Sequence, residues 1–231
     1  MENIVWDARD PQRLGGFWAA ALGAEPITDE PDLVEARLTL GSGSYLDLCF
    51  PRVVDPSTSP ARLRLDLAGG ARQDAVVAAL LALGAHPADT GRGRVPWVVL
   101  DDPEDAAFRV LPGPDGPEDT GPIAAVLMDS ADPARDATFW AEITGWARTE
   151  STADMVALRH ATGAGPRLEL WHEPGPKLDK NRVHLDVRRE DGDIDPTERL
   201  LDLGATSLSA RGDLPWLVFA DPSGNEFCVI G

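Results

Sequence analysis

The chain carries the stretch DPQRLGGFW at residues 10–18 and the related stretch DPARDATFW at residues 132–140. Four further matches follow in the same order, at offsets that drift only from 122 to 119 residues: Leu46–Leu48 with Leu168–Leu170, Arg64–Leu67 with His184–Val187, Leu80–Ala85 with Leu200–Ala205, and Pro96–Val99 with Pro215–Val218. Ordered matches at a nearly constant offset indicate a repeated structural unit. The sequence therefore predicts a tandem duplication, with one copy at residues 1–113, a second at 123–231, and a Gly- and Pro-rich linker at 114–122.

Each copy divides again into two modules with the order β-α-β-β-β. The strand predicted at residues 4–7 is followed by Asp10 and Pro11, which are typical of an N-cap and a first helical position. Gly23 is suited to end that helix, because glycine readily adopts positive φ. Alternating runs at residues 34–40 and 45–50 then indicate half-buried strands. The chain is thus predicted to contain four modules of the α+β class.

The composition limits the classes of partner. With 43% hydrophobic and 26% charged residues, the chain has the composition of a globular protein. A formal net charge of −18 repels nucleic-acid backbones and anionic membranes. Two cysteines cannot form a disulfide framework, no apolar run is long enough for a membrane helix, and residues 1–7 do not resemble a signal peptide. We therefore expect a cytoplasmic protein that binds neither nucleic acid nor membrane.

Two motifs in the second copy carry a family resemblance. They are KNRVHLD at residues 180–186 and DPSGNEF at residues 221–227. With the paired modules, they resemble the vicinal-oxygen-chelate superfamily (glyoxalases, bleomycin-resistance proteins and dioxygenases), in its glyoxalase-like, tandem two-domain form. The resemblance implies two tandem glyoxalase-like domains, each a pair of βαβββ modules forming a curved, cup-shaped mixed sheet with helices outside. The first copy is degenerate, since Asp105, Ala106 and Ala107 replace Gly224, Asn225 and Glu226.

The resemblance also implies positions for metal ligands, on the first and last strands of the modules. The first copy has Asn3, Asp47, Arg64 and Arg109 at these positions, and the second has Ala125, Glu169, His184 and Cys228. If modules pair within a copy, these are the contents of the two cups. If modules pair across the copies, Asn3 and Asp47 join His184 and Cys228, and the other residues share the second cup. Both pairings stay open.

Neither pairing supplies the full His, Gln and Glu set of a catalytic divalent ion. Pairing across the copies comes closest, because carboxylate, imidazole and thiolate together suit zinc. His184, Asp47 and Cys228 are therefore the candidate metal ligands, for Zn, Ni, Mn or Fe. The alternative is that no metal binds.

Period-2 alternation places other polar and aromatic side chains on the cup faces. Glu226 and Asp186 are the candidates for acid–base catalysis, and the candidates for substrate binding are Trp171, Trp216, Arg182 and Glu169. A structural alternative stands beside each role: Asp186 hydrogen-bonds a neighbouring strand, and the Glu226 motif builds a hairpin. Similarly, Arg64 and Arg109 either form a basic pocket for a carboxylate or phosphate, or are neutralised by Asp47 in a pocket that binds nothing.

Two functions remain open on this sequence. One is a glyoxalase-like lyase, isomerase or dioxygenase-related enzyme that binds a small oxygen-rich metabolite at an atypical or absent metal site. The other is a bleomycin-resistance-like protein that sequesters a drug or metabolite without chemistry. In both, the partner is a small molecule. The internal pseudo-dimer favours a monomer, with a homodimer as the alternative.

Overall fold

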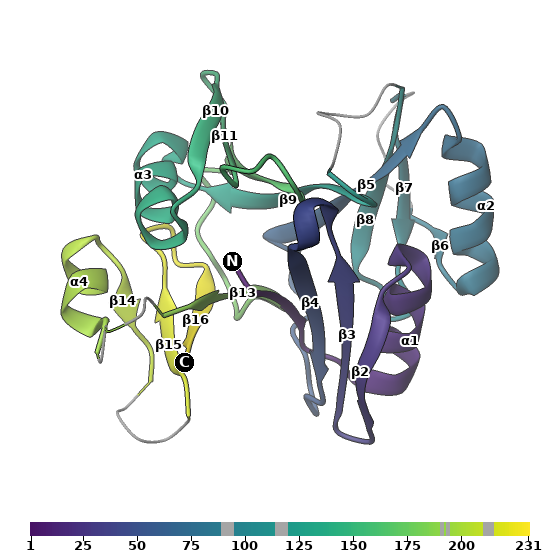
Figure 1. Cartoon of the computed structure of the whole chain (residues 1–231), viewed down its shortest axis with the longest axis horizontal. Coiled ribbons are helices and arrows are strands. Elements are labelled where there is room, and N and C mark those ends of the chain that lie inside the picture. Colours follow the sequence, from purple (N-terminus) through teal and green to yellow (C-terminus); the bar gives the residue numbers. More distant parts are fainter. Residues whose placement is uncertain (89–94, 114–119, 190–191, 193–194, 210–214) are drawn as a thin grey trace.

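The computed structural model describes residues 1–231 except 89–94, 114–119, 190–191, 193–194 and 210–214. Its described part contains two eight-stranded mixed sheets, which we call the terminal sheet and the central sheet (Figure 1). The terminal sheet has the order β14-β15-β16-β13-β1-β4-β3-β2, with β1 (Asn3–Trp6), β2 (Glu25–Glu30), β3 (Leu33–Thr39), β4 (Tyr45–Pro51), β13 (Val183–Arg188), β14 (Thr206–Ser207), β15 (Leu217–Ala220) and β16 (Glu226–Ile230). The central sheet has the order β10-β11-β12-β9-β5-β8-β7-β6, with β5 (Leu63–Gly70), β6 (His86–Pro87), β7 (Val98–Asp101), β8 (Ala107–Pro112), β9 (Ile123–Ser130), β10 (Ala147–Ser151), β11 (Met155–Arg159) and β12 (Arg167–His172). The predicted α+β fold with cup-shaped mixed sheets is confirmed.

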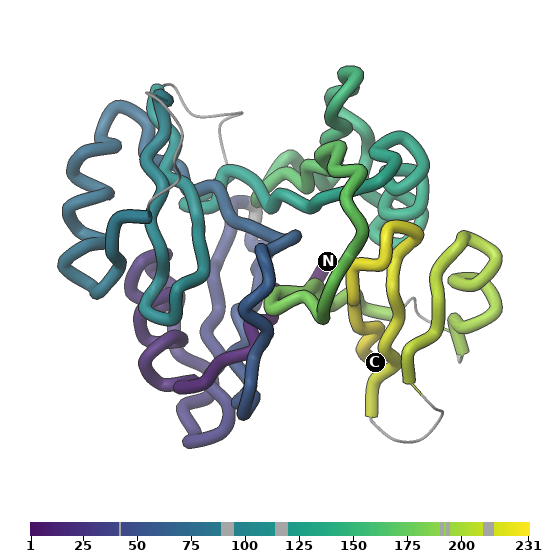
Figure 2. Tube along the Cα trace, turned by 180° about the vertical axis from the view of Figure 1, so that it is seen from behind, coloured from purple at the N-terminus to yellow at the C-terminus, as the bar shows by residue number. Residues whose placement is uncertain are grey.

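Modules pair across the two sequence copies. Strand β1 runs antiparallel to β13, with Asn3 opposite Asp186 and Val5 opposite His184. In the central sheet, β5 runs antiparallel to β9 in the same manner. The N-terminal end accordingly lies beside the late strands, near the middle of the molecule, in both views (Figures 1 and 2). Of the two pairings that the sequence left open, the exchanged one is present, so each sheet combines one module from each copy.

The α-helices of the described residues cover the outer faces of the sheets: α1 (Pro11–Leu22), α2 (Gln73–Leu83), α3 (Pro133–Thr144) and α4 (Thr197–Asp202). The predicted cap is present, because Asp10 accepts a hydrogen bond from the Arg13 amide (3.1 Å) and Gly23 ends α1 at φ 68°. Strand alternation then separates the faces of each sheet. In β4, Leu46, Leu48 and Phe50 are buried toward α1, which leaves Asp47 and Cys49 on the opposite, concave face.

The helices keep the modules of each copy together although their strands belong to different sheets. Helix α1 packs against α2, while α3 and α4 lie at the other end of the molecule (Figure 1). The Trp18 indole on α1 donates a hydrogen bond to Oδ2 of Asp102 (3.2 Å). Asp102 is the residue after β7 of the central sheet. Trp140 on α3 donates to Asp221 Oδ2 (3.1 Å), which follows β15 of the terminal sheet. These two buried hydrogen bonds join the sheets, and they explain why an aspartate follows both strands. No helix of the described part of the chain is long and apolar enough to cross a membrane.

The two indole–carboxylate hydrogen bonds predict a matched pair of destabilised variants. Trp18→Phe and Trp140→Phe should each lower the free energy of unfolding by about 1–3 kcal/mol, because a buried carboxylate oxygen loses a hydrogen-bond donor. Trp216→Phe, at a side chain that is 41% exposed, should change it by less than about 0.5 kcal/mol. Urea unfolding followed by circular dichroism measures all three. Equal stabilities for the three variants would contradict this account of how the sheets are joined.

Candidate functional site

The concave face of the terminal sheet carries a compact group of potential metal ligands. Three residues, His184, Asp186 and Cys228, place one ligand atom each within 4.8 Å of one another. His184 and Asp186 alternate on β13, and Cys228 on β16 lies beside Asp186 in the register. Asn3 on β1 lies opposite Asp186 and donates to its Oδ2 from the side-chain amide (2.9 Å). We call His184, Asp186 and Cys228 the β13–β16 cluster.

The protonation of the cluster follows from its burial. Burial, helped by the positive charge of Lys180, lowers the pKa of His184 to about 4, so the ring is neutral at pH 7. Burial also raises the pKa of Asp186 to about 6, although the hydrogen bonds from Asn3 and Cys228 oppose the shift. The pKa of Cys228 is raised to about 12 by burial and by the neighbouring Asp186 charge. At neutral pH the cluster is thus an imidazole, a carboxylate and a protonated thiol.

Two polar atoms of the cluster lack partners in the described structure. His184 Nδ1 and Asp186 Oδ1 are both buried and neither has a hydrogen bond. His184 Nε2 lies 3.6 Å from Asp186 Oδ1, beyond hydrogen-bond distance. Buried polar atoms are nearly always satisfied in proteins, so an unsatisfied pair marks a place where a ligand is expected.

The central sheet contains the duplicated counterpart of this cluster, with different residues. Asp66 takes the place of Asp186, and it lies beside Arg109 in the register as Asp186 lies beside Cys228. The Arg109 guanidinium binds Asp66 with two hydrogen bonds, of 2.6 and 2.5 Å. Burial still raises the pKa of Asp66 despite this partner. The carboxylate of the central sheet therefore has a built-in cation, whereas Asp186 has none from the described residues.

The other charged residues of the central cup also neutralise one another. Arg64 binds Asp129 at 2.6 and 3.2 Å, and Arg167 forms an ion pair with Glu169. The Trp171 indole donates to the same Glu169 carboxylate (2.9 Å). Of the two interpretations of Arg64 and Arg109, the arrangement fits the neutralised one, although the acidic partners are Asp129 and Asp66 and not Asp47.

The residues predicted for the site are divided between the two cups. Glu169 and Trp171 lie on β12 of the central sheet, and Trp216 lies just before β15 of the terminal sheet. Asp47 lies beside Asn3 in the terminal sheet but is bound by Arg37 (2.8 and 2.7 Å) and is outside the cluster. Of the predicted metal ligands and acid–base residues, only His184, Asp186 and Cys228 form one cluster.

The two motifs of the second copy form contacts between segments. The Glu226 carboxylate accepts one hydrogen bond from Lys177 Nζ (2.5 Å) and one from the backbone amide of Asn181 (3.1 Å). Arg182 is buried and forms an ion pair with Glu104, a residue outside the motifs. Glu104 also accepts from the Arg9 and Asp10 amides, so it joins the start of α1 to β13. No local pattern identifies Glu104, because its partners are distant in sequence.

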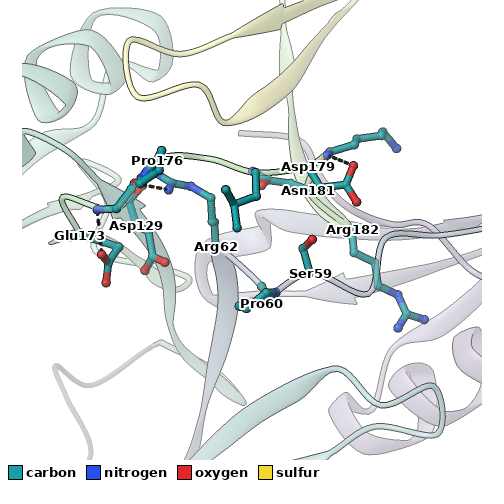
Figure 3. A pocket seen from close by; sticks show the side chains of 13 residues that line it. Ser59, Pro60, Arg62, Asp129, Glu173, Pro176, Asp179, Asn181 and Arg182 are labelled. Atoms are coloured by element: carbon teal, nitrogen blue, oxygen red, sulfur yellow. Dashed lines mark hydrogen bonds between the residues drawn. The ribbon is translucent and has the colours of Figure 1, made fainter.

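A cavity of about 200 Å³ lies where two connections pass between the sheets, from β4 to β5 and from β12 to β13 (Figure 3). Arg62 and Arg182 line it together with Asp129 and Asn181. The Arg62 guanidinium donates to Asn225 Oδ1 (3.0 Å) and to the Asp129 carbonyl (3.2 Å). Since both arginines are engaged in contacts within the protein, they are not available to a ligand, and the β13–β16 cluster is the stronger candidate site.

Comparison with known proteins agrees with the fold and the duplication. The model of the glyoxalase-like domain family matches residues 3–111 and again 125–230. The chain therefore belongs to the glyoxalase-like domain family of the vicinal-oxygen-chelate superfamily. No match is found among curated proteins.

Solved structures extend this similarity over the whole chain. Glyoxalase I from Zea mays has a TM-score of 0.67 at 17% identity, covering 100% of this chain and 91% of that one. A point mutant of the same maize enzyme has a TM-score of 0.65 at 18% identity, covering 100% of this chain and 92% of that one. A putative dioxygenase from Bacillus subtilis subsp. subtilis str. 168 has a TM-score of 0.64 at 16% identity, covering 99% of this chain and 84% of that one. At these identities the likeness establishes the shared fold.

The contrast between the two cups predicts that Arg109 stabilises the protein through charge. Arg109→Met should lower the free energy of unfolding by about 3 kcal/mol, because it leaves the buried Asp66 carboxylate without its hydrogen-bonded cation. Adding Asp66→Asn should recover most of this loss. Arg37→Met, in the more exposed pair with Asp47, should cost no more than about 1 kcal/mol. Urea unfolding of the four proteins tests this, and a double variant no more stable than Arg109→Met would refute it.

Proposed function

We propose that this protein binds one divalent transition metal of the zinc type at the β13–β16 cluster, and a small oxygen-rich metabolite beside it. The observation that carries the proposal is the buried Asp186 carboxylate without a cation, at the place where its duplicate Asp66 holds Arg109. A neutral imidazole, a carboxylate and a thiol form a donor set that suits zinc. The unsatisfied Asp186 Oδ1, which lies 3.6 Å from His184 Nε2, fits such an ion.

Each residue of the cluster would have a defined task. His184 is already neutral, so it can donate a ring lone pair without losing a proton. Asn3 holds Asp186 through Oδ2, which leaves Oδ1 available to a cation. Cys228 would bind as the thiolate, and its proton would be released on metal binding. In this proposal Asp186 is a ligand and not an acid–base group.

When bound, the metal would polarise an oxygen of the metabolite as a Lewis acid. Glu226 is tied to Lys177 and Asn181, so we assign it to holding the connection before β13 and not to proton transfer. Three protein ligands leave a position for the metabolite, as in catalytic zinc sites. This arrangement supports a glyoxalase-like lyase or isomerase.

Sequestration without chemistry is the second candidate, and Trp216 favours it. Val218 lies opposite Cys228 in the register, and Trp216 comes just before β15, two residues ahead of Val218, so continuing the alternation of β15 by one residue would turn the indole to the same concave face. A half-exposed indole provides a flat apolar wall for a bound ligand. Turnover of a metabolite by the metal-loaded protein separates the two candidates, because sequestration leaves the bound molecule chemically unchanged.

Metal binding is the direct test of the proposal. Protein freed of metal with a chelator should bind one Zn²⁺ or Co²⁺ per chain, and the cobalt form should show sulfur-to-metal charge-transfer absorption. His184→Ala, Asp186→Asn and Cys228→Ser should each weaken the affinity by more than about 100-fold, and Asn3→Ala by about tenfold, since it removes the group that orients a ligand.

Cys49→Ser is the matched control, because Cys49 lies on the same concave face but outside the cluster. Its metal affinity should equal that of the unaltered protein. The proposal fails if the unaltered protein takes up no stoichiometric metal, or if Cys228→Ser binds as tightly as Cys49→Ser.

A further inference from the structure

A second carboxylate faces the same cup as the cluster. Glu35 on β3 alternates with the buried Val34 and Ala36, so it lies on the concave face. It is opposite Cys49, which lies beside Val5 in the register, and Val5 is opposite His184. Glu35 and His184 therefore occupy one row across the sheet, three strands apart, or about 14 Å along the sheet surface.

Only short side chains separate Glu35 from the cluster within this row. They are Val5 and Cys49. Burial raises the pKa of the Cys49 thiol, and the charges of Glu35, Asp186 and Asp47 add to the shift. The charges of all three carboxylates therefore act on the Cys49 thiol.

The charges on this concave face are not balanced. Strands β1, β3, β4, β13 and β16 carry the carboxylates Glu35, Asp47, Asp186 and Glu226. Asp47 is paired with Arg37 and Glu226 with Lys177. Glu35 accepts from the Thr28 hydroxyl (2.6 Å) and from the Cys49 thiol (3.6 Å), both neutral donors. Among the described residues, no lysine or arginine forms an ion pair with Glu35 or Asp186. Lys180, whose charge acts on His184 and Cys228, is paired with Asp7.

We propose that Glu35 pairs with a protonated amine of the ligand, so that the cup takes a small molecule with metal-binding oxygens at one end and an ammonium group at the other. The inference rests on the proposed function, because the oxygen end is held at the β13–β16 cluster. The chain's net charge of −18 attracts such a cationic ligand. A carboxylate that is partly removed from water and has only neutral donors gains more from an ammonium than an exposed carboxylate does.

A pair of hydroxamates tests the inference on the zinc-loaded protein. Hexanohydroxamic acid and 6-aminohexanohydroxamic acid share the metal-binding head and the chain, and they differ in the terminal amine. We expect the amine to bind about tenfold more tightly by isothermal titration calorimetry, which is about 1.4 kcal/mol. Glu35→Gln should abolish this difference. Glu142→Gln removes the same charge from the exposed surface of the outer helix α3 and should preserve it.

The inference is overturned if the two hydroxamates bind equally to the unaltered protein, or if the amine's advantage survives in Glu35→Gln. Either result leaves the metal site standing, because zinc binding is measured beforehand. If zinc does not bind, the proposed function fails separately, and n-hexylamine then tests Glu35 alone. A thermal shift with hexylamine that Glu35→Gln removes would support the amine site, and the absence of any shift would refute it.

Discussion

The antiparallel pairing of β1 with β13 is the contact on which the architecture and the candidate site depend. It joins the first module to the last, and it places Asn3 opposite Asp186 and Val5 opposite His184. A shift of one residue would turn the whole row toward the helices, so the buried apolar face fixes the register. The same pairing leaves the two central modules to form the second sheet. The cluster, its orienting Asn3 and the row that leads to Glu35 all follow from it.

Duplication has produced two cups that differ in whether the protein supplies a cation to the buried carboxylate. In the central cup each buried carboxylate has a protein cation, and Arg109 with Asp66 is the clearest pair. In the terminal cup Cys228 replaces that arginine, and the carboxylate of Asp186 has neutral neighbours. A buried charge without a partner is costly. Its retention at one of two duplicated positions is most simply explained by a cation that arrives from solution.

Much of the fold could be predicted from the sequence, because repeats, caps and alternation are local signals. The Asp-Pro caps mark α1 and α3, and the alternation of β4 separates its two faces correctly. The pairing of modules could not be decided, since β1 presents the same alternating pattern to either partner. Within the site, the sequence predicts His184 and Cys228 as metal ligands and Asp186 as an acid–base residue. The resemblance adds Asp47 to the metal ligands, and its contact with Arg37, on a neighbouring strand, has no sequence signature.

The coordination of a bound ion tests the central claim most directly. X-ray absorption at the zinc edge, on protein loaded with one equivalent of zinc, measures the distances and types of the ligand atoms. We predict one sulfur at about 2.3 Å and nitrogen or oxygen neighbours at about 2.0–2.2 Å. A shell without sulfur would show that Cys228 does not bind the ion, and it would contradict the cluster as the metal site.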